Sequence, residues 1–333
     1  MPSLKNSRWV LVGVGAGVAS ALLALVSLIS PWGRLLVGWF WSLPLSLAIA
    51  GLGPAAGLLA SGIVVALVWG LAGPISTLFT VLPLLLVGWG YGQTWRWKWP
   101  PGRSLAAVTL AAGVVSLALT GLAWWVWHQP PFPWGDQLRN SADQVIATYQ
   151  RLGLLDQALG QGLTEATLRQ QLVMVVGWLE RLAPSIGATG TMLEAGIAYY
   201  ITTAFFCYLH LPGTDSGHGG KLPLYTWALP WYSVWVFMIG LGMALAGDYL
   251  KQPLLVTIGG NLLYLYLAVA FAIGLAVISF YVNKYKLPPV LEALGVVVIL
   301  INLPFAVAIC AAIGLFDPLF NWRRLGKKGE GVG

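Results

Sequence analysis

The sequence predicts an all-α, polytopic integral membrane protein with about eight or nine transmembrane segments and an extramembrane helical insert, and three observations support this class. Of the 333 residues, 58% are hydrophobic and only 9% are charged, whereas soluble proteins carry about 25% charged residues. The apolar residues form runs of roughly 20, the length of a membrane-spanning helix. Short loops with Gly and Pro, or basic clusters, separate many of the runs. One large soluble domain is therefore excluded, as is disorder, which requires low hydrophobicity and high net charge.

The N-terminal membrane bundle, residues 1–127, is predicted to hold five segments: 9–30, 35–50, 54–71, 75–92 and 105–127. The first follows Lys5 and Arg8, but its apolar run is longer than the roughly 7–15 residues of a signal-peptide core, so we interpret it as a retained span. The second segment is short and contains Pro44, which favours a tilted or partly re-entrant helix.

Residues 128–183 form the predicted extramembrane insert, because their composition changes. Five of the eleven acidic residues of the chain fall within it. Apolar residues recur at roughly helical spacing in 138–152 and again in 168–179. This spacing predicts two amphipathic helices that lie outside the bilayer or on its surface.

The C-terminal membrane bundle, residues 184–316, is predicted to hold four segments, and a basic tail follows at 317–333: the segments are 184–209, 225–246, 254–281 and 289–316. Asn302 and Pro304 interrupt the last segment, which favours either one crossing or a broken hairpin. We favour the hairpin, because it returns the basic tail to the cytoplasm.

Basic residues in short loops predict the orientation, since Lys and Arg gather on the cytoplasmic side. The first strong cluster is Arg96, Lys98 and Arg103. The sequence therefore predicts a multi-pass protein of the cytoplasmic (inner) membrane, with the 128–183 insert outside and the C-terminus inside. In this interpretation the basic residues behind the net charge of +7 set the orientation of the chain in the membrane. We therefore expect the lipid bilayer, and not nucleic acid, as partner.

Glu194 is the strongest functional candidate, because an ionised carboxylate at membrane depth costs several kcal/mol unless it is paired or hydrated. Thr202 shares its helical face, and Tyr199 lies nearby. Asn261 is a second polar group at depth, and Trp231 belongs to three tryptophans spaced by four residues. These five residues form the candidate solute-binding set. The alternatives are interfacial pairing for Glu194, interhelical hydrogen bonding for Asn261 and an interfacial aromatic belt for Trp231.

Signatures of enzymes are missing from the chain. It contains no G-x-x-x-x-G-K-[ST], no H-E-x-x-H and no G-x-S-x-G, so we expect neither ATP hydrolysis nor another enzymatic activity, and no catalytic residue. His210, Asp215 and His218 share one loop, but two histidines and one carboxylate are a weak metal signature. Cys207 and Cys310 lie in apolar runs and are expected to be small buried hydrophobes. We therefore expect no metal and no cofactor.

Small residues repeat every four positions in the first segment, which lets helices approach closely. They form two adjacent faces: Gly13, Gly17 and Ala21, and Ala16, Ser20 and Ala24. The stripes indicate either packing inside the bundle or a face on which a partner subunit docks.

The C-terminal third carries motifs at 229–231, 259–262, 274–281 and 313–324. They resemble the YybS-like family of bacterial polytopic membrane proteins, whose function is unassigned. The most specific part is the closing pattern that contains Gly314, Asp317 and Arg323. The resemblance marks as family-motif residues Pro230, Trp231, Asn261, Tyr281, Gly314, Asp317 and Arg323.

Residues 10–95 are also similar to the substrate-binding subunits of energy-coupling-factor vitamin transporters. The similarity lies in the small-residue first helix, the short Pro-broken second segment and the Gly-rich third and fourth segments. In that family the small-residue face docks a transmembrane coupling subunit, and ATPases supply energy in trans. The resemblance implies this docking role for Ala16, Ser20 and Ala24.

Three functions are consistent with these observations. We expect a component that binds or transports a small solute and is energised by partner proteins. The alternative is a non-transporting membrane scaffold that recruits cell-envelope partners through the insert or the tail. The third and least supported is a membrane enzyme that acts on a lipid-linked substrate.

Overall fold

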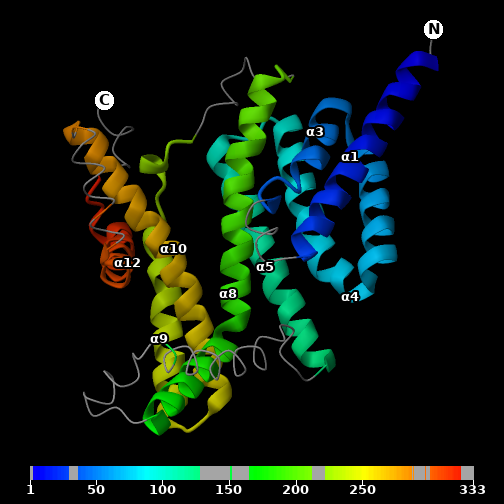
Figure 1. Ribbon diagram of the computed structural model, residues 1–333. Helices are drawn as coiled ribbons and strands as arrows, with labels where there is room; N and C mark the ends of the chain where they lie inside the picture. The colour runs from blue at the N-terminus through cyan, green and yellow to red at the C-terminus, as the bar shows by residue number, and fades with distance from the viewer. Residues whose placement is uncertain are drawn as a thin grey trace. The chain divides into compact units, whose positions relative to one another are not determined.

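The computed structural model describes residues 3–29, 37–127, 151, 165–211, 222–286, 288, 297 and 301–323. In these residues the regular structure is helical, which confirms the all-α class (Figure 1). The α-helices are α1 (Ser3–Ile29), α3 (Leu43–Leu52), α4 (Pro54–Arg96), α5 (Pro101–Trp127), α8 (Glu165–Tyr208), α9 (Val234–Tyr249), α10 (Pro253–Tyr285) and α12 (Leu303–Phe320). Two short 3-10 helices, η2 (Leu224–Thr226) and η3 (Trp231–Ser233), precede α9. The first predicted helix of the insert, 138–152, lies almost entirely outside the described residues.

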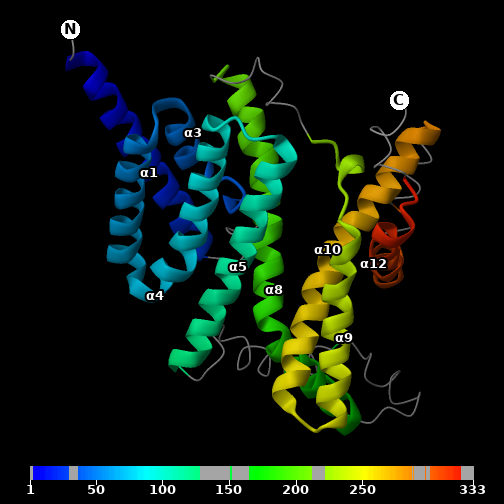
Figure 2. The same cartoon turned by 180° about the vertical axis from the view of Figure 1, so that it is seen from behind.

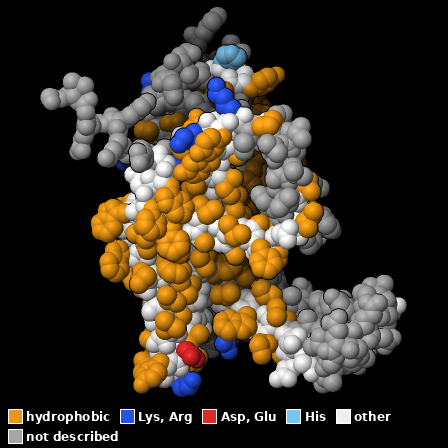
Figure 3. Space-filling view, turned by 90° about the vertical axis from the view of Figure 1, so that its left-hand side faces the viewer, with side chains coloured by type: hydrophobic (Ala, Val, Ile, Leu, Met, Phe, Trp, Pro, Cys, Tyr) orange, Lys and Arg blue, Asp and Glu red, His pale blue; other side chains and the backbone are white. Residues whose placement is uncertain are grey.

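Six helices of the described part are long and apolar enough to cross a membrane, which confirms the polytopic prediction. They are α1, α4, α5, α9 extended by η3, α10 and α12. Figure 3 shows one face of the molecule on which hydrophobic side chains cover a broad area and few charged ones are visible. Such a face suits hydrocarbon rather than water.

The described chain divides into two compact units, each built from separated stretches of sequence. The first contains described residues of 1–116, 188–231 and 269–333, and the second those of 117–187 and 232–268. Helices α5, α8 and α10 contribute to both units. The bundles that we predicted, 1–127 and 184–316, are continuous in sequence, so the compact units divide the chain differently.

The boundary that we drew between the insert and the C-terminal bundle lies inside a helix. Helix α8 continues from Glu165 through Pro184 to Tyr208. A proline removes one backbone hydrogen bond and bends a helix without obliging it to end. Composition changes near residue 183, but the backbone does not break there.

Helix α4 is two helices joined at a sharp turn, and Figure 2 shows it doubling back on itself. Gly73, at φ 81° and ψ 172°, leaves the helical region there. Glycine tolerates this positive φ, and the following Pro74 disfavours a helical conformation for its predecessor. The Thr77 hydroxyl donates a 2.7 Å hydrogen bond to the Gly73 carbonyl. The predicted segments 54–71 and 75–92 are thereby confirmed as separate helical limbs.

Helix α3 corrects the predicted second segment, 35–50. Residues 38–42 form turns, and the helix begins at Leu43 with Pro44 in its first turn, where a missing N–H costs little. The helix ends before Gly53, which has a φ of 104°. Its 10 residues span about 15 Å, about half of the hydrocarbon core.

Helices α1, α3 and α4 form a core in the first unit by close approach of their backbones (Figure 1). A Cβ placed on Gly17 would lie 2.8 Å from the Ala60 carbonyl oxygen of α4. A Cβ on Gly88 of α4 would lie 2.6 Å from a methyl carbon of Leu45 on α3. Glycines at these points let the neighbouring helices come closer than a side chain would allow.

Helices α10 and α12 cross in the same way within the first unit. A Cβ on Gly274 would collide with the Cys310 carbonyl, and a Cβ on Gly314 would collide with the Ala270 carbonyl. The same atom on Gly314 would lie 2.6 Å from the backbone nitrogen of Gly274. Because both contacts are with backbone, a larger residue cannot be accommodated by a rotamer change. Cys310 is buried at this crossing, as we expected from the sequence.

Helix α9 and the first part of α10 form the main hairpin of the second unit, and the two helices lie side by side in Figures 1 and 2. A Cβ on Gly259 would lie 2.5 Å from the backbone nitrogen of Ala244, so the two backbones are nearly in contact. Lys251, with a φ of 55°, turns the chain between the helices.

Replacing Gly314 by Leu should destabilise the protein by about 1–3 kcal/mol or more, because the side chain must push two backbones apart. The check is thermal unfolding of the purified protein in mild detergent. Gly242→Leu is the matched control, since a Cβ on Gly242 meets no atom within 4 Å. Equal melting temperatures for the two variants would contradict a backbone contact at Gly314.

Candidate functional site

The predicted polar face of α8 packs against α4 and α5 in the first unit. The Tyr199 ring lies edge-on to the Tyr91 ring of α4, with centroids 5.5 Å apart. The Tyr91 hydroxyl donates a 2.8 Å hydrogen bond to the Ala195 carbonyl of α8. Thr191 donates a 3.3 Å hydrogen bond to the Ser116 hydroxyl of α5. These polar groups therefore connect α8 to α4 and α5, and Tyr91 and Tyr199 also line a small cleft.

A small cleft lies beside this interface, at the ends of α4 and α5. The Thr94 and Ser104 hydroxyls are 2.6 Å apart in its wall. Its volume is about 20 Å³, which is room for one water molecule but not for an organic solute.

The three α8 members of the predicted solute set therefore differ in environment. Tyr199 is buried in the tyrosine contact, and Thr202 is buried with a hydroxyl that has no hydrogen-bond partner among the described residues. Glu194 is half-buried on the same helix and does not line the small cleft. A ligand role for these residues stays a prediction.

Asn261, in the second unit, is bound to the bend of α8 at Pro184. Its side-chain oxygen accepts a 3.0 Å hydrogen bond from the Ser185 N–H, and its side-chain nitrogen donates a 2.7 Å bond to the Arg181 carbonyl. In a regular helix Ser185 and Arg181 are the i and i−4 partners that bond to each other. The amide of Asn261 thus engages both members of a backbone pair next to the proline. A second donation, at 2.8 Å, goes to the Thr257 carbonyl of its own helix.

This geometry gives Asn261 a structural role. In a bilayer the backbone groups that a proline frees must be satisfied by side chains or neighbouring helices. Both donors and one acceptor position of the amide are used in this way. The observation favours the interhelical hydrogen bond that we weighed as the alternative for Asn261.

Trp231 does not share a helical face with Trp227 and Trp235. Residues 227–230 have no regular secondary structure, Trp231 begins η3, and Trp235 belongs to α9. The prediction that Trp227, Trp231 and Trp235 form an aromatic ligand site on one helical face is therefore wrong. Trp231 itself is 65% exposed, and Pro230 is exposed beside it, as expected of residues at a membrane–water interface.

The predicted docking face of α1 is covered by the chain itself. Ala24 and Ser20 are fully buried, and Ala16 is nearly so. Ala16 and Ala24 belong to the same core as Ala60 and Leu84 of α4. Burial of these residues favours the internal-packing interpretation of the small-residue stripe.

Asp317 and Arg323 form a buried ion pair at the end of α12. Arg323 donates to both carboxylate oxygens, at 2.6 Å from Nη2 and 3.3 Å from Nε. Asn321, in the left-handed conformation at φ 45°, reverses the chain so that Arg323 returns to Asp317. The third contact of the guanidinium is a 3.0 Å bond from Nη1 to the Tyr225 carbonyl of η2. The pair therefore joins the end of α12 to the segment that precedes α9.

The closing motif of the sequence is thereby explained as an anchor. Gly314 permits the α10–α12 crossing, and Asp317 and Arg323 secure the chain just beyond it. Tyr281 adds a 3.4 Å hydrogen bond from its hydroxyl to the Trp322 carbonyl. Arg323 lies in the predicted basic tail, and Asp317 offsets its charge. The predicted start of that tail, residue 317, likewise lies inside α12.

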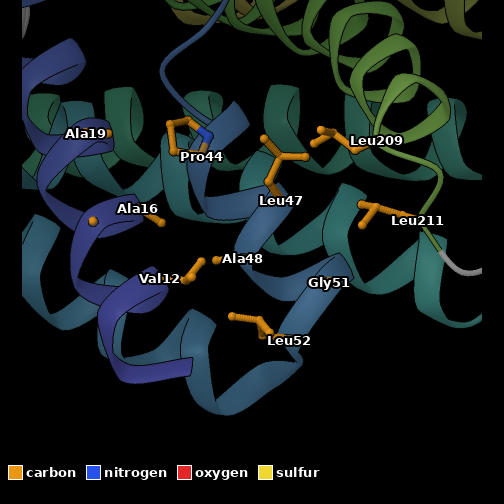
Figure 4. Close-up of a pocket in the computed structure, with 11 residues that line it drawn as sticks. Val12, Ala16, Ala19, Pro44, Leu47, Ala48, Gly51, Leu52, Leu209 and Leu211 are labelled. Atoms are coloured by element: carbon orange, nitrogen blue, oxygen red, sulfur yellow. The ribbon is translucent and has the colours of Figure 1, made fainter. Parts of the chain in front are cut away.

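An open apolar groove with a volume of about 550 Å³ lies on the first unit. Figure 4 shows α3 at its centre, with α1 on one side and the turn after α8 on the other. The lining comprises Val12, Gly15, Ala16, Ala19, Pro44, Leu47, Ala48, Gly51, Leu52, Leu209 and Leu211. None of these side chains carries a polar group, so the groove suits an apolar ligand.

We did not predict this groove from the sequence. Its residues come from three separate stretches, and apolar residues in an apolar helix provide no local signal. The small residues of α1, such as Ala16, were the one signal of the groove in the sequence. We interpreted them as a face for packing inside the bundle or for docking of a partner subunit.

The described helices define a polytopic α-helical membrane protein whose interior is joined by small residues and buried polar contacts. The chain belongs to the family described as "Predicted membrane protein (DUF2232)", whose family model matches residues 18–318. Neither the curated proteins nor the solved structures contain a match. The more specific resemblances, to YybS-like proteins and to substrate-binding subunits, stay predictions.

Replacing Asn261 by Ala should destabilise the protein by about 1–3 kcal/mol, because backbone groups of α8 lose their partner. Asn261→Asp should cost at least as much, since a carboxylate would face the Arg181 carbonyl that now accepts a hydrogen bond. Thermal unfolding in detergent measures both variants. Asn283→Ala is the control, because Asn283 lies on the same helix and its described bond goes to Ser279 of that helix. Asn261→Ala as stable as Asn283→Ala would contradict the role at the bend.

Replacing Arg323 by Ala should destabilise the protein by about 3–5 kcal/mol, because it leaves a buried carboxylate without its partner. The double variant Asp317→Leu with Arg323→Met should recover much of this loss, since neither charge is then buried. Unfolding midpoints of the single and double variants test the pair. Losses that simply add in the double variant would show that the two side chains do not interact.

Proposed function

We propose that this protein binds a small solute with an apolar chain, taken from the bilayer, in the groove formed by α1, α3 and the turn after α8. The observation that carries the proposal is an open groove of about 550 Å³ lined by apolar side chains. Ligand sites of proteins typically occupy about 300–1,000 Å³ and are mostly apolar. A polar solute would lose its hydration there without gaining a hydrogen bond from a lining side chain.

The proposal keeps solute binding as the function but moves it away from Glu194. Asn261 is engaged with the α8 bend, Tyr199 is packed against Tyr91, and the cleft nearby holds about one water. We also keep the cytoplasmic membrane as location, with the end of α4 at Arg96 and the following Lys98 on the cytoplasmic side. The chain has no ATPase or hydrolase motif, so we propose that it is not an enzyme, and that any energy for transport comes from a coupling subunit and ATPases in trans.

The alternative function is a membrane scaffold that does not transport. The close packing of helices at Gly17, Gly88 and Gly314 supports it, because a dry, tightly packed interior leaves little room for a solute path. A scaffold would recruit partners through the insert or the tail, most of which lie outside the described residues.

Gly15→Trp tests the proposal, because Gly15 lines the groove and a Cβ there meets no atom within 4 Å. The purified protein is exposed to phosphatidylcholine with a photoactivatable acyl chain, irradiated and digested, and the labelled peptides are identified by mass spectrometry. Wild type should be labelled at α3 and at residues 209–211. Gly15→Trp should lose most of this labelling, since the indole fills the groove.

Gly62→Trp is the matched control, because Gly62 is also open to substitution but does not line the groove. It should label like wild type. Equal labelling of α3 in wild type and Gly15→Trp, with both variants folded, would overturn the groove as binding site.

A further inference from the structure

We propose that the ligand of the groove is an anionic lipid, whose acyl chain lies along α3 and whose phosphate is bound by the Arg96 guanidinium at the end of that helix. This inference rests on the proposed function, because it names the ligand class of the same groove.

Arg96 lies at one end of the groove, beside the last residues of α3. Gly51 and Leu52 line the groove, and a Cβ on the next residue, Gly53, would be 3.3 Å from Nη1 of Arg96. The same nitrogen donates a 3.4 Å hydrogen bond to the Ile49 carbonyl. The guanidinium is therefore within one helical turn of the groove lining.

The Arg96 guanidinium has the capacity to bind a phosphate. The side chain carries five N–H donors in a planar fork that suits phosphate oxygens. Among the described residues, the guanidinium of Arg96 makes one hydrogen bond, the 3.4 Å contact with the Ile49 carbonyl. No carboxylate of the described residues forms an ion pair with it. The residue is exposed, so a ligand can reach it without a rearrangement of the helices.

The residues around Arg96 are of the types found at the level of the lipid headgroups. Trp97 follows it and is 61% exposed, as is common for tryptophan at the membrane interface. Lys98 is exposed two residues further on, and the Arg103 guanidinium lies 4.5 Å from the centre of the Trp99 ring. This basic end is the side that we predict to be cytoplasmic, where anionic lipids concentrate and basic pockets between helices bind their headgroups.

The dimensions of the groove favour an acyl chain over the helix of a partner protein. Pro44 and Leu52 both line it, and at 1.5 Å per residue they are about 12 Å apart along α3. The groove volume of about 550 Å³ is in the range of small-molecule sites. A 12 Å length of α-helix about 10 Å across occupies about 900 Å³, so the groove suits an acyl chain better than a helix.

A simpler role for Arg96 is to cap α3. A cation near the last carbonyls of a helix is favourable by itself, and the Ile49 contact fits that role. The two roles make different predictions, because a cap does not distinguish one lipid headgroup from another.

The experiment measures binding of dioleoyl phosphatidylglycerol and dioleoyl phosphatidylcholine to the full-length protein in mild detergent, by native mass spectrometry. Wild type should prefer phosphatidylglycerol by about fivefold, the effect of about one cationic contact. Arg96→Gln should lose this preference, because phosphatidylglycerol binding falls more than binding of phosphatidylcholine, whose choline cation already offsets the phosphate charge. Arg96→Lys should keep most of it and serves as a second variant if Arg96→Gln folds poorly. Arg103→Gln is the control, because its guanidinium is engaged with Trp99, and it should keep the preference.

The outcomes separate the headgroup inference from the groove. An unchanged preference in Arg96→Gln would overturn the headgroup assignment and leave the groove intact. Wild-type binding of both lipids by Gly15→Trp would overturn the proposed function itself. Displacement of phosphatidylglycerol by millimolar inorganic phosphate, with no loss of phosphatidylcholine, would assign Arg96 to free phosphate instead of lipid. Recovery of a partner helix on the groove in place of either lipid would overturn both.

Discussion

Backbone contact between helices at glycine and alanine is the constraint on which the rest of this structure depends. In a bilayer, helices gain no hydrophobic energy from leaving lipid, so they associate through close van der Waals packing. Gly17 lies against the Ala60 backbone, Gly314 against that of Ala270, and Gly274 against that of Cys310, and at each point a Cβ would collide with the neighbour. Small residues of the same kind, Gly15, Ala16 and Gly51, also line the open groove.

A second constraint is that backbone groups left free where a helix bends, turns or ends need a hydrogen-bond partner. The proline bend of α8 is repaired by the Asn261 amide, and the turn in α4 by the Thr77 hydroxyl. The end of α12 is secured by Arg323, which binds both Asp317 and the Tyr225 carbonyl. Several polar residues that look functional in an apolar sequence are therefore used to complete the fold.

Because these polar side chains are used in helix contacts, the groove is a better candidate ligand site than the polar face of α8. Thr191 and Tyr199 on the polar face of α8 contact α5 and α4. The groove has no polar lining side chain and ends beside a cation. An apolar groove with a charged end matches an amphiphile better than a water-soluble metabolite. A protein of this kind can draw its ligand from the bilayer itself, without a path through its packed interior.

The sequence by itself determined the membrane class, the all-α fold and the break at Gly73 and Pro74, because composition, run length and backbone preference are local properties. Only the tertiary structure decided that Ala16, Ser20 and Ala24 face their own chain, and that Asn261 bonds to the α8 bend. Helical spacing shows which residues share a face, but it cannot show what lies opposite that face. For the same reason the groove and the neighbourhood of Arg96, which combine α1, α3, α4 and the end of α8, emerged only when those stretches were placed together.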